Sequence, residues 1–108
     1  MPRLNGQPDE VSDQILDLLK RKYQPAHPSA DIRAYRYNSA SVRVRIIDPD
    51  FAGKDTAQRE DMVWPILESL PERVLEDISV VLLIPPEERD SSLLSLQFDN
   101  PSRPIGIA

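Results

Sequence analysis

The sequence predicts an α+β domain in which helices cover one face of a small mixed sheet of three strands. Three patterns lead to this class: apolar residues at helical spacing in 9–23, alternating segments at 31–37 and 41–47, and an almost wholly apolar segment at 78–84. The expected order of elements is helix, strand, strand, helix (or two short helices), strand, helix.

The first helix is expected to begin after Asp9, whose side chain can cap it. It is expected to end near Gln24, since the prolines at 25 and 28 cannot continue a helix. The apolar side chains of this segment then share one side of the helix: Val11, Ile15, Leu18, Leu19 and Tyr23.

The segments 31–37 and 41–47 are predicted to form a β-hairpin, because both alternate and a short polar loop separates them. One face of the hairpin is expected to be buried and the other to meet solvent. The buried face carries Ile32, Ala34, Arg36, Val42, Val44 and Ile46, and the open face carries Arg33, Tyr35, Tyr37, Arg43 and Arg45.

The segment after the hairpin reads as a turn followed by a second helix. Gly53 is expected to supply a positive φ in the turn, and Asp55 with Gln58 forms a plausible cap pair. Pro65 lies inside the apolar stripe of the helix and predicts either a kink or two short helices. The strand at 78–84 is expected to be covered on both faces, and a short helix is expected at 91–96.

Composition excludes several classes of site. The chain has no cysteine and one histidine, His27, so disulfides, thiolate ligands and clusters of several histidines are excluded. The net charge of −5 opposes binding to nucleic acid or to anionic membrane. Because no apolar run is long enough to span a bilayer and residues 1–10 lack a signal-peptide core, we expect a cytoplasmic protein without a membrane partner. We also expect a loose leader at 1–8, one domain at 9–100 and a flexible tail at 101–108.

Few residues point to catalysis or to a cofactor. The single glycine before Lys54 is too little for a phosphate-binding loop, and no nucleophile–base pair is visible, so we expect no enzymatic activity and no bound cofactor. His27 is expected to be exposed or to cap a helix rather than to bind a metal. Trp64 is expected to be an anchor in or near the core. The acidic residues after the hairpin are interpreted as a solvated turn and helix cap rather than a cation site: Asp48, Asp50, Asp55, Glu60 and Asp61.

The open face of the hairpin admits two interpretations. Arginines interleaved with Tyr35 and Tyr37 are what single-stranded RNA stacks on and pairs with. Exposed strands also carry arginine for structural reasons, since it pairs with acids and deters edge aggregation. The acidic total charge favours the second interpretation.

Short motifs occur in a fixed order along most of the chain. YQP follows the first helix, YRYN lies in the hairpin and IGIA ends the chain. The clearest series reads Ile46, Ile47, Phe51, Gly53, Lys54, Arg59, Met62, Val63 and Trp64. In order and spacing these motifs resemble the BolA family, whose fold is similar to the type II KH domain, and the likeness covers roughly 16–108.

The resemblance implies a protein-binding domain with a monothiol glutaredoxin as one possible partner. The family carries a histidine in the third strand that ligates an iron–sulfur cluster shared with the glutaredoxin, and by spacing that position is Val81. Members also carry a histidine before the methionine of the second helix, where this chain has Glu60 or Asp61. Because valine cannot donate to iron, the cluster role is not transferred.

We therefore expect a divergent BolA-like domain that acts by protein–protein contact. The expected surface consists of Arg33, Tyr35, Tyr37, Arg43, Arg45, Phe51, Gly53, Lys54, Arg59 and Trp64, extended by the apolar Val81 and Leu83. The alternative is a KH-like binder of single-stranded nucleic acid, or a transcription regulator, that uses the arginines and tyrosines of the hairpin.

Overall fold

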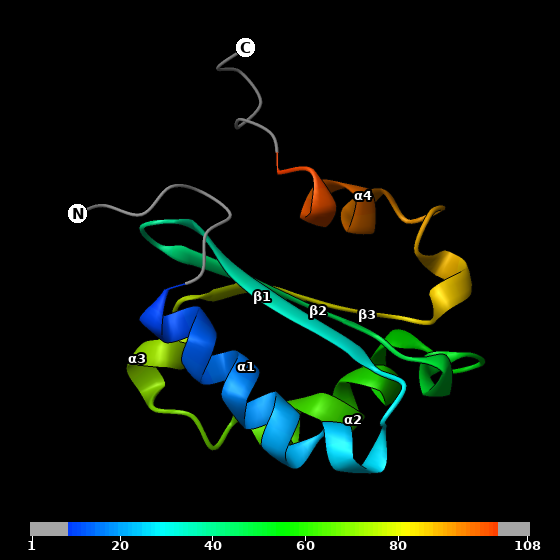
Figure 1. Ribbon diagram of the computed structural model, residues 1–108, viewed down its shortest axis with the longest axis horizontal. Helices are drawn as coiled ribbons and strands as arrows, with labels where there is room; N and C mark the ends of the chain where they lie inside the picture. The colour runs from blue at the N-terminus through cyan, green and yellow to red at the C-terminus, as the bar shows by residue number, and fades with distance from the viewer. Residues whose placement is uncertain (1–8, 102–108) are drawn as a thin grey trace.

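The computed structural model describes residues 9–101, and the expected leader (1–8) and the expected tail beyond Pro101 lie outside them. The chain forms three strands with α-helices before and after them, in the predicted order (Figure 1). The α-helices are α1 (Glu10–Lys22), α2 (Thr56–Leu67), α3 (Glu72–Leu75) and α4 (Leu93–Asp99), and the strands are β1 (Asp31–Asn38), β2 (Ser41–Ile47) and β3 (Ile78–Ile84). Short 3-10 turns lie at Gln24–Ala26, Pro49–Phe51 and Pro86–Glu88.

A capping box begins α1, as the sequence predicts. The backbone N–H of Ser12 donates to Asp9 Oδ1 (2.8 Å), and the backbone N–H of Asp9 donates to Ser12 Oγ (2.9 Å). These bonds satisfy donors that the first turn of a helix leaves without partners. The same reciprocal arrangement joins Asp55 and Gln58 at the start of α2.

The sheet is mixed and β2 is its central strand. β1 pairs antiparallel with β2, with Ala34 opposite Val44, and β2 pairs parallel with β3, with Val44 opposite Val81. The parallel pair requires a crossover, which α2 and α3 provide. These findings confirm the α+β class and the mixed three-stranded sheet.

The main core lies between the sheet and the layer formed by α1, α2 and α3 (Figure 1). Val42, Val44 and Ile46 of β2 are fully buried there, together with Ile15 and Leu19 of α1. Alternation in the hairpin therefore places the predicted residues on the buried side. Burial of aliphatic side chains of this size stabilises the fold by about 1.5–3 kcal/mol each.

The fourth helix departs from the single helical layer that the sequence predicts. α4 lies on the opposite face of the sheet from α1 (Figure 1), and its Phe98 and Ser95 are buried there. The sequence signal for this helix was three leucines, Leu93, Leu94 and Leu96. They do not form its buried side, because the helix begins later and ends later than predicted and is anchored through Phe98.

The turn between β2 and α2 follows the predicted chemistry. Gly53 has φ +78°, and no atom lies within 4 Å of the position that a Cβ would take, so backbone conformation alone favours glycine there. Pro65 lies within α2 near its end, and a separate short helix, α3, follows Pro71. Among the described residues, no helix is long and apolar enough to cross a membrane.

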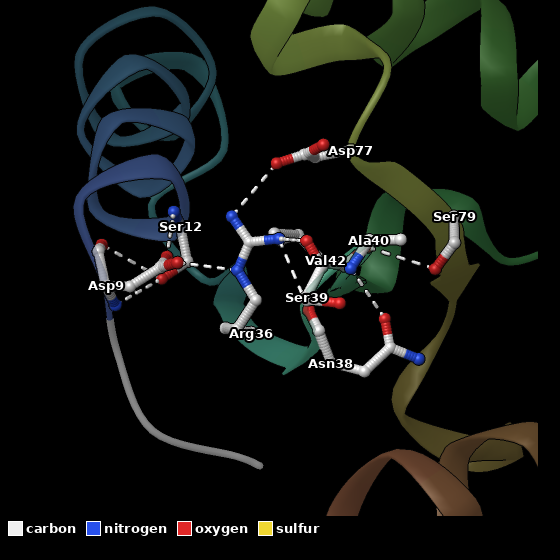
Figure 2. A network of polar contacts seen from close by, with 9 residues as sticks. All are labelled: Asp9, Ser12, Arg36, Asn38, Ser39, Ala40, Val42, Asp77 and Ser79. Atoms are coloured by element: carbon white, nitrogen blue, oxygen red, sulfur yellow. Dashed lines mark hydrogen bonds and ion pairs between the residues drawn. The ribbon is translucent and has the colours of Figure 1, made fainter. Parts of the chain in front are cut away.

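Arg36 ties three parts of the fold together (Figure 2). Its Nε donates to Asp9 Oδ2 at the start of α1 (2.6 Å), and its Nη2 donates to Asp77 Oδ2 just before β3 (3.0 Å). Its Nη1 reaches the main-chain oxygens of Asn38 and Ser39 in the hairpin loop (3.3 Å each). Burial alone would raise the pKa of Asp9, but hydrogen bonds from the Ser12 backbone and from Arg36 outweigh it and hold the pKa below the ordinary 3.8.

We predict that Arg36→Met lowers the free energy of unfolding by about 2 kcal/mol, because two largely buried carboxylates lose their partner. Urea unfolding at pH 7 measures this, with Arg33→Met as the control. Arg33 is exposed and its Nε lies 3.4 Å from Asp31 Oδ1, so its loss should change stability by less than about 0.5 kcal/mol.

The cost of Arg36→Met should also depend on pH. The pKa of Asp9 is lower in the folded state, so its contribution is complete well above pH 4 and is lost as the pH falls through the folded-state value. The difference between wild type and variant should therefore shrink on acidification below about pH 4. An equal difference at pH 3 and pH 7 would contradict this role of Arg36.

Candidate functional site

The open face of the hairpin, defined here as Arg33, Tyr35, Tyr37, Arg43 and Arg45, is partly covered by α4. Arg45 is fully buried, and its Nη1 donates to Asp99 Oδ2 (2.9 Å) and to Ser95 Oγ (3.0 Å). Its guanidinium carbon lies 4.5 Å from the ring centroid of Phe98. The hydrogen bond from Arg45 holds the pKa of Asp99 below the ordinary 3.8.

Tyr35 is held by the same helix. Its hydroxyl donates to the main-chain oxygen of Phe98 (2.8 Å), and the two rings meet edge to face at 4.7 Å. The expectation that Tyr35 and Arg45 face solvent is therefore wrong. The physical reason is that a tyrosine and an arginine on one face of a sheet can pack against an aromatic ring of a later helix. Their polar ends then donate hydrogen bonds to a main-chain oxygen and a carboxylate of that helix.

The remaining hairpin residues stay near the surface. The Arg43 guanidinium lies 3.6 Å from the centre of the Tyr37 ring, which is a cation–π contact, and Arg33 is exposed. Thus the structure packs Tyr35 and Arg45 against α4 in one cluster. Arg43 borders this cluster, since its Nη1 donates to the Tyr35 hydroxyl (3.5 Å).

Three turn residues that carry the family resemblance, Phe51, Lys54 and Arg59, stabilise the turn rather than form an exposed patch. Phe51 is fully buried, and the Lys54 ammonium donates to the main-chain oxygen of Asp50 (2.8 Å). Arg59 donates to the main-chain oxygens of Lys54 (2.9 Å) and Leu83 (3.0 Å), and it forms an ion pair with Glu88 (3.1 Å).

Three apolar residues of the expected surface also pack inward. Trp64 is half-buried against the core, as its predicted role of anchor requires. Val81 packs against the same core and Leu83 is buried in it, so neither extends the open face of the hairpin. The reason is register, since both side chains point toward the helical layer opposite α4.

The free edge of β3 has backbone groups that point away from the sheet. The Asp48 N–H donates to the Ile84 oxygen (3.0 Å), so Ile84 bonds toward β2. In a parallel ladder this direction alternates along the strand, so Val81 and Leu83 direct their N–H and C=O groups to the free edge. The contact from Arg59 to the Leu83 oxygen agrees with this and covers one of these groups.

A hollow of about 310 Å³ runs along this edge between the start of α2 and α4. It is lined by residues of α2, β3, the 3-10 turn after it and α4, including Arg59, Glu60, Val81, Leu82, Glu88 and Leu94. Leu94 of α4 lines this hollow and is 57% exposed, and Leu93 (70%) and Leu96 (43%) are exposed on the same helix. We call β3, this hollow and these leucines the β3-edge surface.

A second polar cluster lies where β2 ends. Tyr23 is buried and its hydroxyl donates to Asp48 Oδ2 (2.6 Å), while its ring stacks on His27 with centroids 4.1 Å apart. Burial and the bond to Asp48 raise the pKa of Tyr23 far above its ordinary value. Asp48 is 1% exposed, so the expectation of a fully solvated acidic turn is wrong for this residue.

Sequence reasoning missed both the β3-edge surface and this cluster. His27 and Asp50 are separated by 23 positions and meet only because η1, the 3-10 turn at Gln24–Ala26, follows α1 close to the turn after β2. The available signal for the β3 edge was the leucine run at 93–96, whose exposure depends on which face of the sheet the helix covers.

Comparisons with protein-family profiles, with curated proteins and with solved structures each find no match for this chain.

We predict that Asp99→Asn loosens α4, because Arg45 would remain buried with its charge unpaired. Amide hydrogen exchange within 93–99 should speed up roughly 30-fold, which corresponds to about 2 kcal/mol of local stability. Asp90→Asn, at an exposed acid preceding α4, should leave these rates unchanged.

Acid should have the same effect on the wild-type protein. The pKa of Asp99 is lowered in the folded state, so its stabilising contact is lost as the pH falls through that value, below about 4. Exchange in α4 that is as slow in Asp99→Asn as in wild type would show that Arg45 does not hold the helix.

Proposed function

We propose that this chain is a divergent BolA-like domain that acts without enzymatic activity, in the cytoplasm, by binding an extended segment of another protein at the β3-edge surface. The observation that carries the proposal is the free edge of β3, with outward N–H and C=O groups at Val81, lying beside the exposed Leu94 of α4. Unpaired edge groups form a template onto which a further strand can add.

Strand addition fits the geometry of the hollow. A segment added beside β3 would place alternate side chains toward α2 and toward α4. On the α4 side it would meet Leu94, and on the α2 side it would meet the aliphatic part of Arg59. Main-chain hydrogen bonds would supply affinity and these contacts would supply selectivity.

The charge of the surface indicates the chemistry of the partner. Glu60 and Glu88 line the hollow, and the only basic residue among its lining side chains, Arg59, is already paired with Glu88. The whole chain carries a net charge of −5. A segment that alternates apolar residues with Lys or Arg therefore complements this surface best.

Two observations favour this surface over nucleic-acid binding by the hairpin. Arg45 and Tyr35, two of the five side chains on which that alternative depends, are buried beneath α4. The net charge of −5 would repel phosphates from the remainder. Binding of single-stranded RNA is therefore the competing outcome in the binding experiment.

The resemblance leaves a glutaredoxin as one candidate partner without a shared cluster. Val81 stands where the family has its ligand histidine, and its side chain packs against the core. It offers no donor atom to iron, so complex formation should not depend on an iron–sulfur cluster.

We predict that peptides selected from a random displayed library against the full chain alternate apolar and basic residues and bind with Kd on the order of 10 µM. Val81→Pro should weaken the best of them at least tenfold. Proline removes the outward N–H, and it is tolerated in an edge strand when that N–H faces away from the sheet. Val81→Thr, which keeps the N–H and nearly the same shape, is the matched control and should bind like wild type.

A second pair of variants tests the leucines. Leu93→Ser with Leu94→Ser should weaken the peptide about tenfold without lowering stability, since both side chains are exposed. Equal binding by wild type, Val81→Pro and the leucine variant would overturn the proposal. Binding of labelled single-stranded RNA, falling steeply between 50 and 200 mM salt, would instead support the nucleic-acid alternative.

A further inference from the structure

We propose that His27, Asp48 and Asp50 form a binding site for a transition-metal dication, with Zn²⁺ as the best match. Nothing in the β3-edge function requires this site, since it lies at the turn after β2. Its ligand atoms all lie within 4.8 Å of one another, and they come from two segments that the fold brings together.

The distances fit a metal with few protein ligands. His27 Nδ1 lies 2.7 Å from Asp50 Oδ2 and 3.2 Å from Asp48 Oδ2. Zinc binds nitrogen and carboxylate oxygen at about 2.0–2.2 Å, so neighbouring ligand atoms of a tetrahedral ion are separated by about 3.3 Å. The contact between His27 and Asp50 must lengthen slightly to admit the ion, and the Asp50 side chain is 57% exposed.

The charges around His27 Nδ1 favour a bound dication. Two carboxylates converge on this one nitrogen, and a single proton on Nδ1 can form a good hydrogen bond to only one of them. The Lys54 ammonium binds the main-chain oxygen of Asp50 rather than either carboxylate, according to the contacts among described residues. A dication would take the place of the Nδ1 proton, which leaves to solvent, and would neutralise both carboxylates.

The ligands are oriented by neighbours of the kind that support metal sites. Asp48 Oδ2 accepts a hydrogen bond from the Tyr23 hydroxyl (2.6 Å), and Asp48 Oδ1 accepts one from the Asp50 N–H (2.9 Å). The His27 ring is stacked on Tyr23, and Tyr23 in turn lies against Phe51. Such second contacts fix the direction of a ligand and raise metal affinity.

The donor set decides which metals fit. One imidazole nitrogen with two carboxylate oxygens suits Zn²⁺, Co²⁺ or Mn²⁺, whereas Ca²⁺ and Mg²⁺ prefer oxygen ligands alone. His27 is 21% exposed and Asp50 more so, which leaves the remaining coordination positions open to water.

The test is a titration of the full chain, without a purification tag, with ZnCl₂ by calorimetry and by NMR of the imidazole. His27 is the only histidine, so any imidazole signal reports this site alone. We expect saturable one-to-one binding with Kd on the order of 10 µM and a shift of the His27 ring signals. CaCl₂ and MgCl₂ at the same concentrations should produce no binding heat and should leave the His27 ring signals unshifted.

Variants separate the site from adventitious binding. His27→Gln and Asp50→Asn should each weaken Zn²⁺ binding at least tenfold, while Asp17→Asn, at an exposed acid of α1, should leave it unchanged. Asp50 is exposed, so its variant folds even if His27→Gln does not. The proposal would be overturned if the His27 ring signals did not shift in excess Zn²⁺. It would also be overturned if Asp50→Asn bound Zn²⁺ with the same affinity as wild type.

Discussion

The ion pair between Arg45 and Asp99 determines which parts of the sheet α4 covers and which it leaves exposed. It fixes α4 across the far face of β2, and the Tyr35 hydroxyl adds a second attachment at Phe98. The arginine is costly to bury, since its Nε and Nη2 have no hydrogen-bond partner among the described residues. The ring of Phe98 beneath the guanidinium offsets part of that cost. With α4 in place, two of the five side chains on the open face of the hairpin are buried, and Leu94 of α4 lines the hollow beside β3.

Local rules predict the elements of this fold well. Alternation places both strands of the hairpin, and side-chain caps at Asp9 and Asp55 place two helix starts, because these signals act within a few residues. The face that α4 covers is not a local property. It depends on Arg45 and Asp99 finding each other across the sheet, and a buried arginine looks the same in sequence as an exposed one.

The candidate sites were harder to predict for the same reason. Alternation correctly assigned Arg45 to the face opposite the main core but gave no information on a later helix that would cover it. The edge position of β3 follows from the order of the strands in the sheet, which the apolar sequence of β3 does not reveal. His27 became a candidate ligand only through tertiary contact with Asp48 and Asp50.

The two proposed sites lie near each other in the fold. The Asp48 N–H donates to the last residue of β3, Ile84, and Asp48 also carries a candidate metal ligand. The turn between them holds Lys54, whose main-chain oxygen accepts from Arg59, the residue that covers part of the β3 edge. A metal at His27 would stiffen this turn without touching the groups that a partner strand would use.

Amide hydrogen exchange at β3, with and without a selected peptide, distinguishes strand addition from binding elsewhere. We expect fast exchange at Val81 and slow exchange at Val80 and Leu82 in the free protein, because only the latter two donate to β2. Adding the peptide should slow amide exchange at Val81 and leave the exchange rate at Leu82 unchanged. A Val81 amide that is already slow in the free protein, or that stays fast in the complex, would contradict strand addition at this edge.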